Sequence, residues 1–197
     1  PWNILITGVG GTGVVTIGAL LGMAGHLENK GASVLDQTGL AQKGGAVTTH
    51  IRIAKTPADI HAVRIAAGEA DLVLGCDMVV VNDYWALSKV RVGRTQVVLN
   101  SYEAMPGTFT TRPDMQFPAT DIISAVRTAL GGNEQALEKL HVVDATQLAK
   151  LESYRLPAQA AADDARRAGL ADTAIPYAAE AKPVAAARGG ASQAQKR

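Results

Sequence analysis

The sequence has 197 residues, a single cysteine (Cys76) and few aromatic residues. One cysteine excludes an intramolecular disulfide, an iron–sulfur cluster held by this chain alone and a cysteine-rich zinc site. The net charge of +1 argues against a nucleic-acid-binding surface, which would need a clear basic excess. We therefore expect no nucleic-acid partner, and we expect the reducing cytoplasm as the compartment.

Charged residues are also missing from residues 1–27. An uncharged run of this length could be a membrane-spanning segment. It contains seven glycines, however, four of them in one turn, and this argues against a lipid-spanning helix. No basic segment precedes it, as a signal peptide would require. We expect no membrane insertion. Because the chain does not begin with Met, we also expect it to be a fragment of a longer chain.

The uncharged stretch predicts a strand at residues 4–7, a first glycine turn at residues 8–13 and a helix that begins at Val14. A helix N-terminus after such a turn presents free N–H groups, which suit a phosphate or another anion. The turn could equally serve tight packing of the strand against the helix, without a ligand. Its candidate ligand-binding residues are Gly8, Gly10, Gly11 and Gly13. Along the helix, Val14, Ile17, Leu21 and Ala24 recur at helical spacing, and Gly18, Gly22 and Gly25 allow another element to pack close.

Asp36 closes a second predicted strand at residues 32–35. Its spacing from Gly13 is close to the ~20 residues at which a dinucleotide-binding fold places the acid that holds a ribose. That fold normally continues into a crossover helix, whereas here the second glycine loop, residues 39–45, follows at once. Asp36 could hold a ribose hydroxyl or simply end the strand.

The second glycine loop, GLAQKGG, is the most specific stretch, and its length favours antiparallel pairing with the alternating strand at residues 46–53 that follows. The sheet is therefore predicted to be mixed, with this loop at the same edge as the first glycine turn. Loops beside a rigid sheet often position functional groups. The candidate binding residues here are Gly39, Gln42, Lys43, Gly44 and Gly45.

The remaining chain alternates strands and helices as far as residue 151. We predict strands at 70–75, 95–100, 109–112 and 141–144, and helices at 78–90 (capped by Asp77), 120–130, 134–140 and 145–151. This order indicates an α/β fold, a three-layer sandwich with a mixed, mostly parallel sheet and a Rossmann-like start. We expect one domain at residues 1–150 and an alanine-rich, disordered tail at residues 151–197.

No residue pattern predicts a catalytic or metal site. Cys76 lies beside Asp77, which disfavours the thiolate, and we expect it to be a small buried residue. The four histidines, His26, His50, His61 and His141, show no metal-ligand spacing. On its own residues, the chain lacks an evident catalytic apparatus.

The segments ILITGVGGTGVVTIGALL and GLAQKGGAVTTHIRI resemble the γ-type domain of 2-oxoacid:ferredoxin oxidoreductases, and most closely the indolepyruvate type. Further similar segments follow in the expected order, so that the resemblance covers residues 2–149. They are ADLVLGCD, VVLN and VDATQLA.

The resemblance implies an inactive part of a larger enzyme. In that family, thiamine diphosphate with Mg²⁺ decarboxylates the 2-oxoacid, iron–sulfur clusters pass electrons to ferredoxin, and CoA accepts the acyl group, giving indole-3-acetyl-CoA from indolepyruvate. This chain would hold none of these cofactors itself. Its two glycine segments would lie at an interface with the thiamine-binding and iron–sulfur parts, or near CoA.

Lys150 and the residues after it depart from the family pattern. Three alternatives remain. The substrate could be another 2-oxoacid, such as pyruvate or ketoisovalerate. The chain could be a stand-alone NAD- or FAD-binding module that uses the first glycine turn and Asp36. It could also be a non-catalytic interaction domain left by gene fragmentation.

Overall fold

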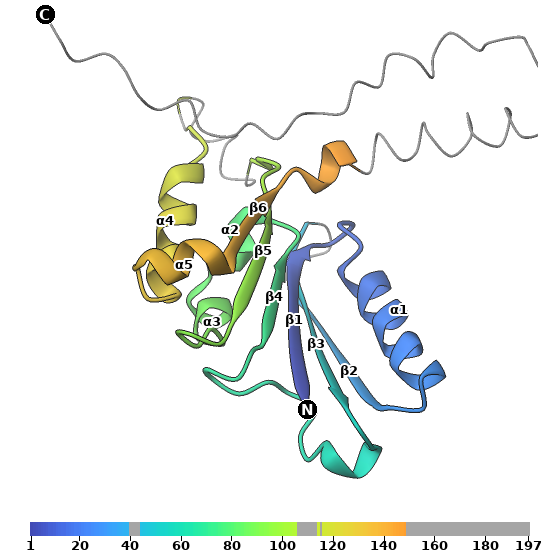
Figure 1. The fold of residues 1–197 in the computed structure, drawn as a ribbon. Helices are drawn as coiled ribbons and strands as arrows, with labels where there is room; N and C mark the ends of the chain where they lie inside the picture. Colours follow the sequence, from blue (N-terminus) through green and yellow to red (C-terminus); the bar gives the residue numbers. More distant parts are fainter. Residues whose placement is uncertain (40–43, 106–113, 115, 149–197) are drawn as a thin grey trace, which may run out of the picture. The chain divides into compact units, whose positions relative to one another are not determined.

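The computed structural model describes residues 1–39, 44–105, 114 and 116–148. Six strands form one sheet in the order β2-β3-β1-β4-β5-β6 (Figure 1). The strands are β1 (Trp2–Val9), β2 (Gly31–Thr38), β3 (Ala46–Ala54), β4 (Leu72–Gly75), β5 (Gln96–Asn100) and β6 (Leu140–Val143). The helices are α1 (Val14–Leu27), α2 (Met78–Val81), α3 (Tyr84–Leu87), α4 (Ala119–Ala129) and α5 (Glu134–Lys139), with a short 3-10 helix at Pro57–Asp59.

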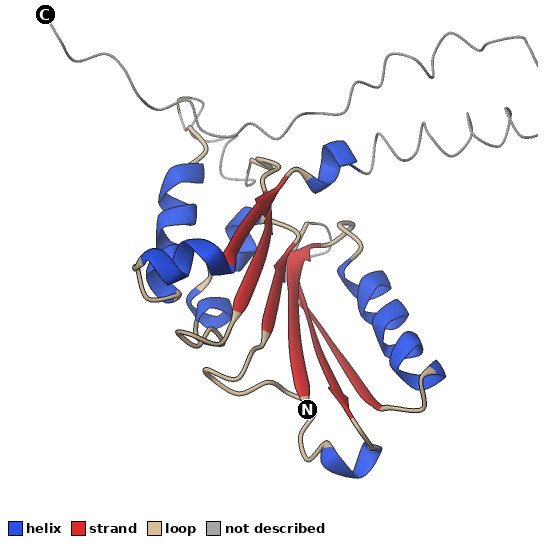
Figure 2. Ribbon diagram, viewed as in Figure 1, coloured by secondary structure: helices blue, strands red, loops and turns tan. Residues whose placement is uncertain are grey.

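Helices cover both faces of this sheet (Figure 2). Alternate side chains of β1 point to opposite faces, as in any strand. Ile4 and Ile6 pack with Val14 of α1, whereas Leu5 belongs to the core formed with α2, α3, α4 and α5. The predicted three-layer α/β sandwich is therefore confirmed.

Strand direction follows the prediction of a mixed, mostly parallel sheet. β1, β4, β5 and β6 are mutually parallel, and β3 runs antiparallel to both β1 and β2. The short connection between β2 and β3 thus makes the expected antiparallel pair, with Asp36 opposite Thr49. β3 is inserted between β1 and β2, so the two strands of the opening unit are not neighbours.

The glycines of α1 bring this helix close to the sheet. A Cβ atom at Gly18 would lie 2.6 Å from Cγ2 of Thr49, and one at Gly22 would lie 2.6 Å from Cγ2 of Val34. Gly18 and Gly25 are buried, as is Val14, whereas Ala24 is exposed. The glycines, rather than the whole predicted apolar stripe, therefore face β2 and β3.

The helix predicted at residues 78–90 is wrong in its length, because two short helices replace it. Asp77 caps α2 as expected, accepting a hydrogen bond of 2.9 Å from the backbone N–H of Val80. Asp83 then takes an extended backbone conformation and accepts from the N–H of Trp85 at 2.7 Å, so it caps α3. An aspartate that bonds nearby backbone competes with helix continuation, which ends α2 after one turn.

The predicted helices at 120–130 and 134–140 are confirmed as α4 and α5. The strand predicted at 109–112 lies outside the described residues, and of the helix predicted at 145–151 only residues 145–148 are described, and these are helical. None of the helices in the described part has the length and apolar character needed to cross a bilayer.

Candidate functional site

The two glycine segments meet at one edge of the sheet, as the sequence predicts. The N–H of Gly10 donates a hydrogen bond of 3.0 Å to the carbonyl of Gly45. The second glycine loop is closed at its base by the N–H of Gly39, which donates to the carbonyl of Ala46 at 3.0 Å. The parallel strands β1, β4, β5 and β6 all end at this edge. Open α/β sheets bind ligands in this region, outside the carboxyl ends of their strands.

The glycines of the first turn serve two different purposes. A Cβ atom at Gly8 would lie 2.6 Å from Cγ2 of Val14 and 3.2 Å from Cβ of Cys76, so Gly8 is required for packing. Gly11 and Gly13 have φ of 99° and 82°, a conformation that favours glycine, and no other atom lies near the position of a Cβ. Close packing therefore accounts for the glycine at position 8, and backbone conformation accounts for Gly11 and Gly13.

The N-terminus of α1 carries no side-chain cap. Its cap residue is Gly13, the first turn has no acidic residue, and the hydroxyl of Thr12 donates back to the carbonyl of Val9 at 2.7 Å. The first N–H groups of a helix have no partner within the helix, and they carry the positive end of its dipole. This end of α1 can therefore bind an anion.

The second glycine loop is described only in part. Gly44 has a φ of 66°, and the position of its Cβ would lie 3.9 Å from Cγ1 of Val9. Gly44 and Gly45 thus lie against the first glycine turn, and Gly39 bonds to Ala46 at the base of the loop. Gln42 and Lys43 fall outside the described residues.

Asp36 does not reach the first glycine turn. It lies within β2 and accepts a hydrogen bond from the hydroxyl of Thr49 on β3. Because β3 separates β2 from β1, Asp36 is two strand spacings away from β1, about 10 Å. A dinucleotide-binding fold places its acid on the neighbouring strand. The tertiary structure therefore removes the geometry that the spacing in the sequence suggests.

Cys76 behaves as the small, unreactive residue that the sequence predicts. It is half-buried at the end of β4, and burial, together with the nearby carboxylate of Asp77, raises the pKa of its thiol. A raised pKa leaves little thiolate near neutral pH, so nucleophilic chemistry at Cys76 is disfavoured.

Sequence reasoning missed a buried polar cluster around His50 of β3. The ring is fully buried: Nδ1 accepts a hydrogen bond of 3.1 Å from the backbone N–H of Ile65, and Nε2 lies 3.2 Å from Oε1 of Gln37. Trp85 packs against the ring edge-to-face, with the ring centroids 5.3 Å apart. The alternation of residues 46–53 does place His50 on a polar face, but it cannot show that α3 and residues 60–69 cover that face.

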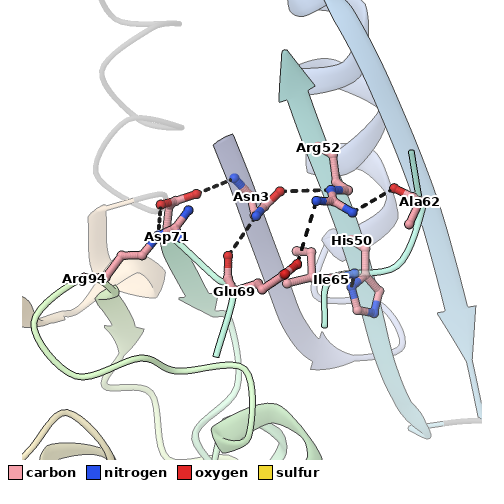
Figure 3. Close-up of polar contacts among 8 residues, drawn as sticks. All are labelled: Asn3, His50, Arg52, Ala62, Ile65, Glu69, Asp71 and Arg94. Carbon is pink, nitrogen blue, oxygen red and sulfur yellow. Dashed lines mark hydrogen bonds and ion pairs between the residues drawn. The ribbon is translucent and has the colours of Figure 1, made fainter. Parts of the chain in front are cut away.

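The residues 60–69 form no helix, because side chains of the sheet satisfy their backbone groups (Figure 3). Nη1 of Arg52 donates to the carbonyl of Ala62 at 3.0 Å, and the side-chain amide of Asn3 donates to the carbonyl of Glu69 at 2.8 Å. Arg52 also donates to the side-chain oxygen of Asn3 at 3.0 Å. These contacts lie near the start of β1, away from the glycine segments, and their role is structural.

Asp71 links the same network to β5 (Figure 3). Burial raises the pKa of this carboxyl, but hydrogen bonds from Arg94 at 2.6 Å and from the N–H of Asn3 at 2.8 Å outweigh burial and lower it. The carboxylate is therefore held ionised at neutral pH. Within the described residues no three His, Cys, Asp or Glu side chains gather as metal ligands.

Comparison with known proteins decides the family. Residues 3–169 match the family described as pyruvate ferredoxin/flavodoxin oxidoreductase. The chain belongs to this family. The match spans both glycine segments and all six strands.

Two similar relatives carry the same name. The indolepyruvate oxidoreductase subunit IorB of Methanothermobacter thermautotrophicus is 30% identical over 148 residues, which is 72% of this chain and 72% of the relative. The protein of the same name from Archaeoglobus fulgidus is 30% identical over 108 residues, 55% of this chain and 50% of the relative.

Two solved structures are similar to this chain at low sequence identity. The pyruvate oxidoreductase subunit PORC of Thermotoga maritima is 12% identical with a TM-score of 0.41, covering 64% of this chain and 82% of that one. The γ subunit of a keto/oxoacid ferredoxin oxidoreductase from Geobacter sulfurreducens is 20% identical with a TM-score of 0.39, covering 71% and 83%.

Proposed function

We propose that this chain is the γ-type subunit or domain of an indolepyruvate ferredoxin oxidoreductase and is inactive without its partners. The observation that carries the proposal is its similarity to the IorB subunit across 72% of both chains, within a matching family. The whole enzyme would convert an aryl 2-oxoacid and CoA into the acyl-CoA and carbon dioxide, with ferredoxin as the electron acceptor. It would work in the cytoplasm.

The division of labour within such an enzyme agrees with the residues of this chain. A single cysteine cannot hold an iron–sulfur cluster, and the sequence has no GDG segment followed by the asparagine of a thiamine-diphosphate site. Partner subunits or domains would supply thiamine diphosphate with Mg²⁺, which stabilises the carbanion formed on decarboxylation, and the clusters that remove the electrons. This chain's own residues would bind and orient CoA and contact the thiamine-binding partner.

The edge formed by the two glycine segments would be the part of this chain nearest to CoA. The uncapped N-terminus of α1, together with the open positions beside Gly11 and Gly13, supports a role in holding one of the phosphates of CoA. The same edge would contact the thiamine-binding partner. We propose no catalytic residue and no metal ligand on this chain, and we keep residues 1–150 as its domain and residues 151–197 as a tail.

The activity is tested by co-expressing this chain with a thiamine-binding, cluster-containing partner and measuring viologen reduction with indolepyruvate and CoA. We expect turnover by the complex and none by the chain alone. If the complex turned over pyruvate or ketoisovalerate but not indolepyruvate, the proposed substrate would change and the proposed reaction type would stand. Reduction by the purified chain alone would overturn the proposal.

The CoA position is tested by two matched glycine substitutions in that complex. Gly11→Ala and Gly93→Ala each place a side chain at a positive φ, 99° and 79°, with open space around it. Gly93 precedes β5 and so lies at the opposite edge of the sheet. We expect Gly11→Ala to raise the KM for CoA several-fold and Gly93→Ala to leave it unchanged. An equal rise of the KM for CoA in both variants would show that the substitutions act through backbone strain and not through the CoA site.

A further inference from the structure

Lys89 is a buried lysine that pairs with none of the carboxylates in the described part of the chain. It follows α3, and only 8% of its surface is exposed. Within the described residues no ion pair involves its ammonium group. A charge taken out of water without a counter-charge is costly, so such a lysine is uncommon unless something else compensates for it.

Trp85 brings a second cation to the same place. Nζ of Lys89 lies 4.9 Å from the centre of the Trp85 ring, and Cζ of Arg64 lies 5.9 Å from that ring. Both distances are in the range of cation–π contact. Arg64 is exposed and, like Lys89, forms no ion pair with a described carboxylate.

Glu69 precedes Ala70, whose N–H donates to the carbonyl of Lys89, but the carboxylate of Glu69 is engaged elsewhere. Glu69 is paired with Arg52 at 3.8 Å, not with Lys89 or Arg64. The uncompensated charge is felt by His50, because burial first, and then Arg64, Lys89 and Arg52, lower its pKa to about 4. Burial and Arg64 likewise lower the pKa of Lys89. Arg64 and Lys89, which pair with no described carboxylate, therefore create a local field that favours an anion.

The ammonium of Lys89 is nevertheless accessible. In the described part of the chain, the hydroxyl of Thr7 is the one fully enclosed side-chain nitrogen or oxygen without a hydrogen-bond partner. Since Nζ of Lys89 has no partner either, it must reach solvent, while its aliphatic stem is buried. Its charged end is therefore the part of Lys89 that a solute can meet.

We propose that Lys89, Arg64 and Trp85 form a binding site for a small oxyanion, a carboxylate or a phosphate group. Arg64 supplies a planar fork that matches two oxygens, and Lys89 supplies a point charge. The Trp85 ring, which both cations contact, forms an apolar wall beside them. The site lies on the face of the sheet opposite α1 and is separate from the glycine segments. It does not depend on the proposed function.

The site is tested on the full chain by the fluorescence of Trp85, read in a Trp2→Phe background so that one tryptophan reports. The chain is titrated with inorganic phosphate and, separately, with sodium acetate, each against sodium chloride at equal ionic strength. We expect a saturable change with at least one of the two oxyanions. Saturation by phosphate alone identifies the ligand group as a phosphate, and saturation by acetate alone identifies it as a carboxylate. Either outcome supports the site.

Matched variants identify the residues. Lys89→Met keeps the buried stem and removes the charge, and we expect the affinity for the oxyanion to fall at least tenfold. Arg64→Gln changes an exposed residue and so does not threaten folding. We expect it to reduce the same affinity several-fold. Lys55→Met removes an exposed lysine elsewhere and should change nothing. Absence of saturation in the parent chain, or saturation unaltered in Arg64→Gln and Lys89→Met, would overturn the site. The site would also be overturned if these variants lost association with a partner subunit while the parent chain bound no oxyanion. That result would indicate that an acidic segment of the partner subunit is the ligand instead.

Discussion

The buried side chain of His50 connects several segments of this protein. Its two ring nitrogens are engaged with residues distant in sequence, Ile65 and Gln37, and its edge contacts Trp85. Its charged form is disfavoured by burial and by Arg64, Lys89 and Arg52, which lower the pKa to about 4. Burial and the three neighbouring cations thus favour the neutral ring.

Acid should therefore destabilise the fold through His50. The unfolded histidine titrates near pH 6.5, so between that value and about 4 the unfolded chain binds the extra proton. The stabilisation is complete above pH 6.5 and is lost as the pH falls toward 4. From pH 7 to pH 5 the loss from this group is about 2 kcal/mol.

The measurement is denaturant unfolding of the parent chain and of His50→Gln at both pH values. Glutamine can still accept the hydrogen bond from the N–H of Ile65 but does not titrate. We expect its free energy of unfolding to depend less on pH, by about 2 kcal/mol over this interval. Identical pH dependence in the two proteins would contradict the assigned role of His50.

At the scale of elements, the contact between α1 and the sheet depends on small residues. Thr49 and Val34 occupy the space that side chains at Gly18 and Gly22 would need. Elsewhere on α1, large apolar residues such as Leu20, Met23 and Leu27 are exposed. The helix is therefore positioned by close approach of its backbone rather than by a deep apolar stripe.

Gly18→Ala should destabilise the protein although alanine is the better helix former. Alanine gains about 1 kcal/mol from helix propensity, but its Cβ would lie 2.6 Å from Cγ2 of the buried Thr49. We expect a net loss of about 1–2 kcal/mol in the free energy of unfolding, since overpacking a filled core costs more than this gain. Chemical denaturation measures it.

Gly25→Ala is the matched control in the same helix. Its Cβ would lie 3.3 Å from Cβ of Ala32, a contact that a slight shift can relieve. We expect its stability to stay within about 1 kcal/mol of the parent, in either direction. If Gly18→Ala were as stable as Gly25→Ala, close packing at Thr49 would not be what holds α1.

At the scale of the whole molecule, the order of strands separates this protein from dinucleotide-binding folds. β3 returns along β1 and displaces β2 to the edge, so that Asp36 lies two strand spacings from β1 and is bonded to Thr49. The first glycine turn keeps its own geometry and meets the second glycine loop instead. An adenosine ribose at this turn therefore has no acid from Asp36 to bind.

Thermal unfolding of the full chain with NAD, FAD and CoA tests this consequence. A ligand at 100 times its Kd adds about 2.7 kcal/mol, which is readily seen. We expect no stabilisation by NAD or FAD, and stabilisation by CoA if the chain by itself supplies enough of that site. Stabilisation by NAD that disappears in Asp36→Asn would restore the dinucleotide-binding interpretation.

Several features could be predicted from the sequence because they depend on local chemistry. The glycine turn and the helix after it, the cap at Asp77 and the antiparallel β2–β3 pair follow from backbone preferences and from a connection too short for a crossover. The GLAQKGG segment and its neighbours also identified the family, which the match over residues 3–169 confirms.

Other features were decided by contacts between residues far apart in the chain. Residues 60–69 take their hydrogen bonds from Asn3, His50 and Arg52, so no local pattern could predict their path. The same holds for the cations around Trp85, which come from two segments that only the folded sheet brings together. Periodicity reports which face of an element is apolar; which partner covers that face is a property of the tertiary structure alone.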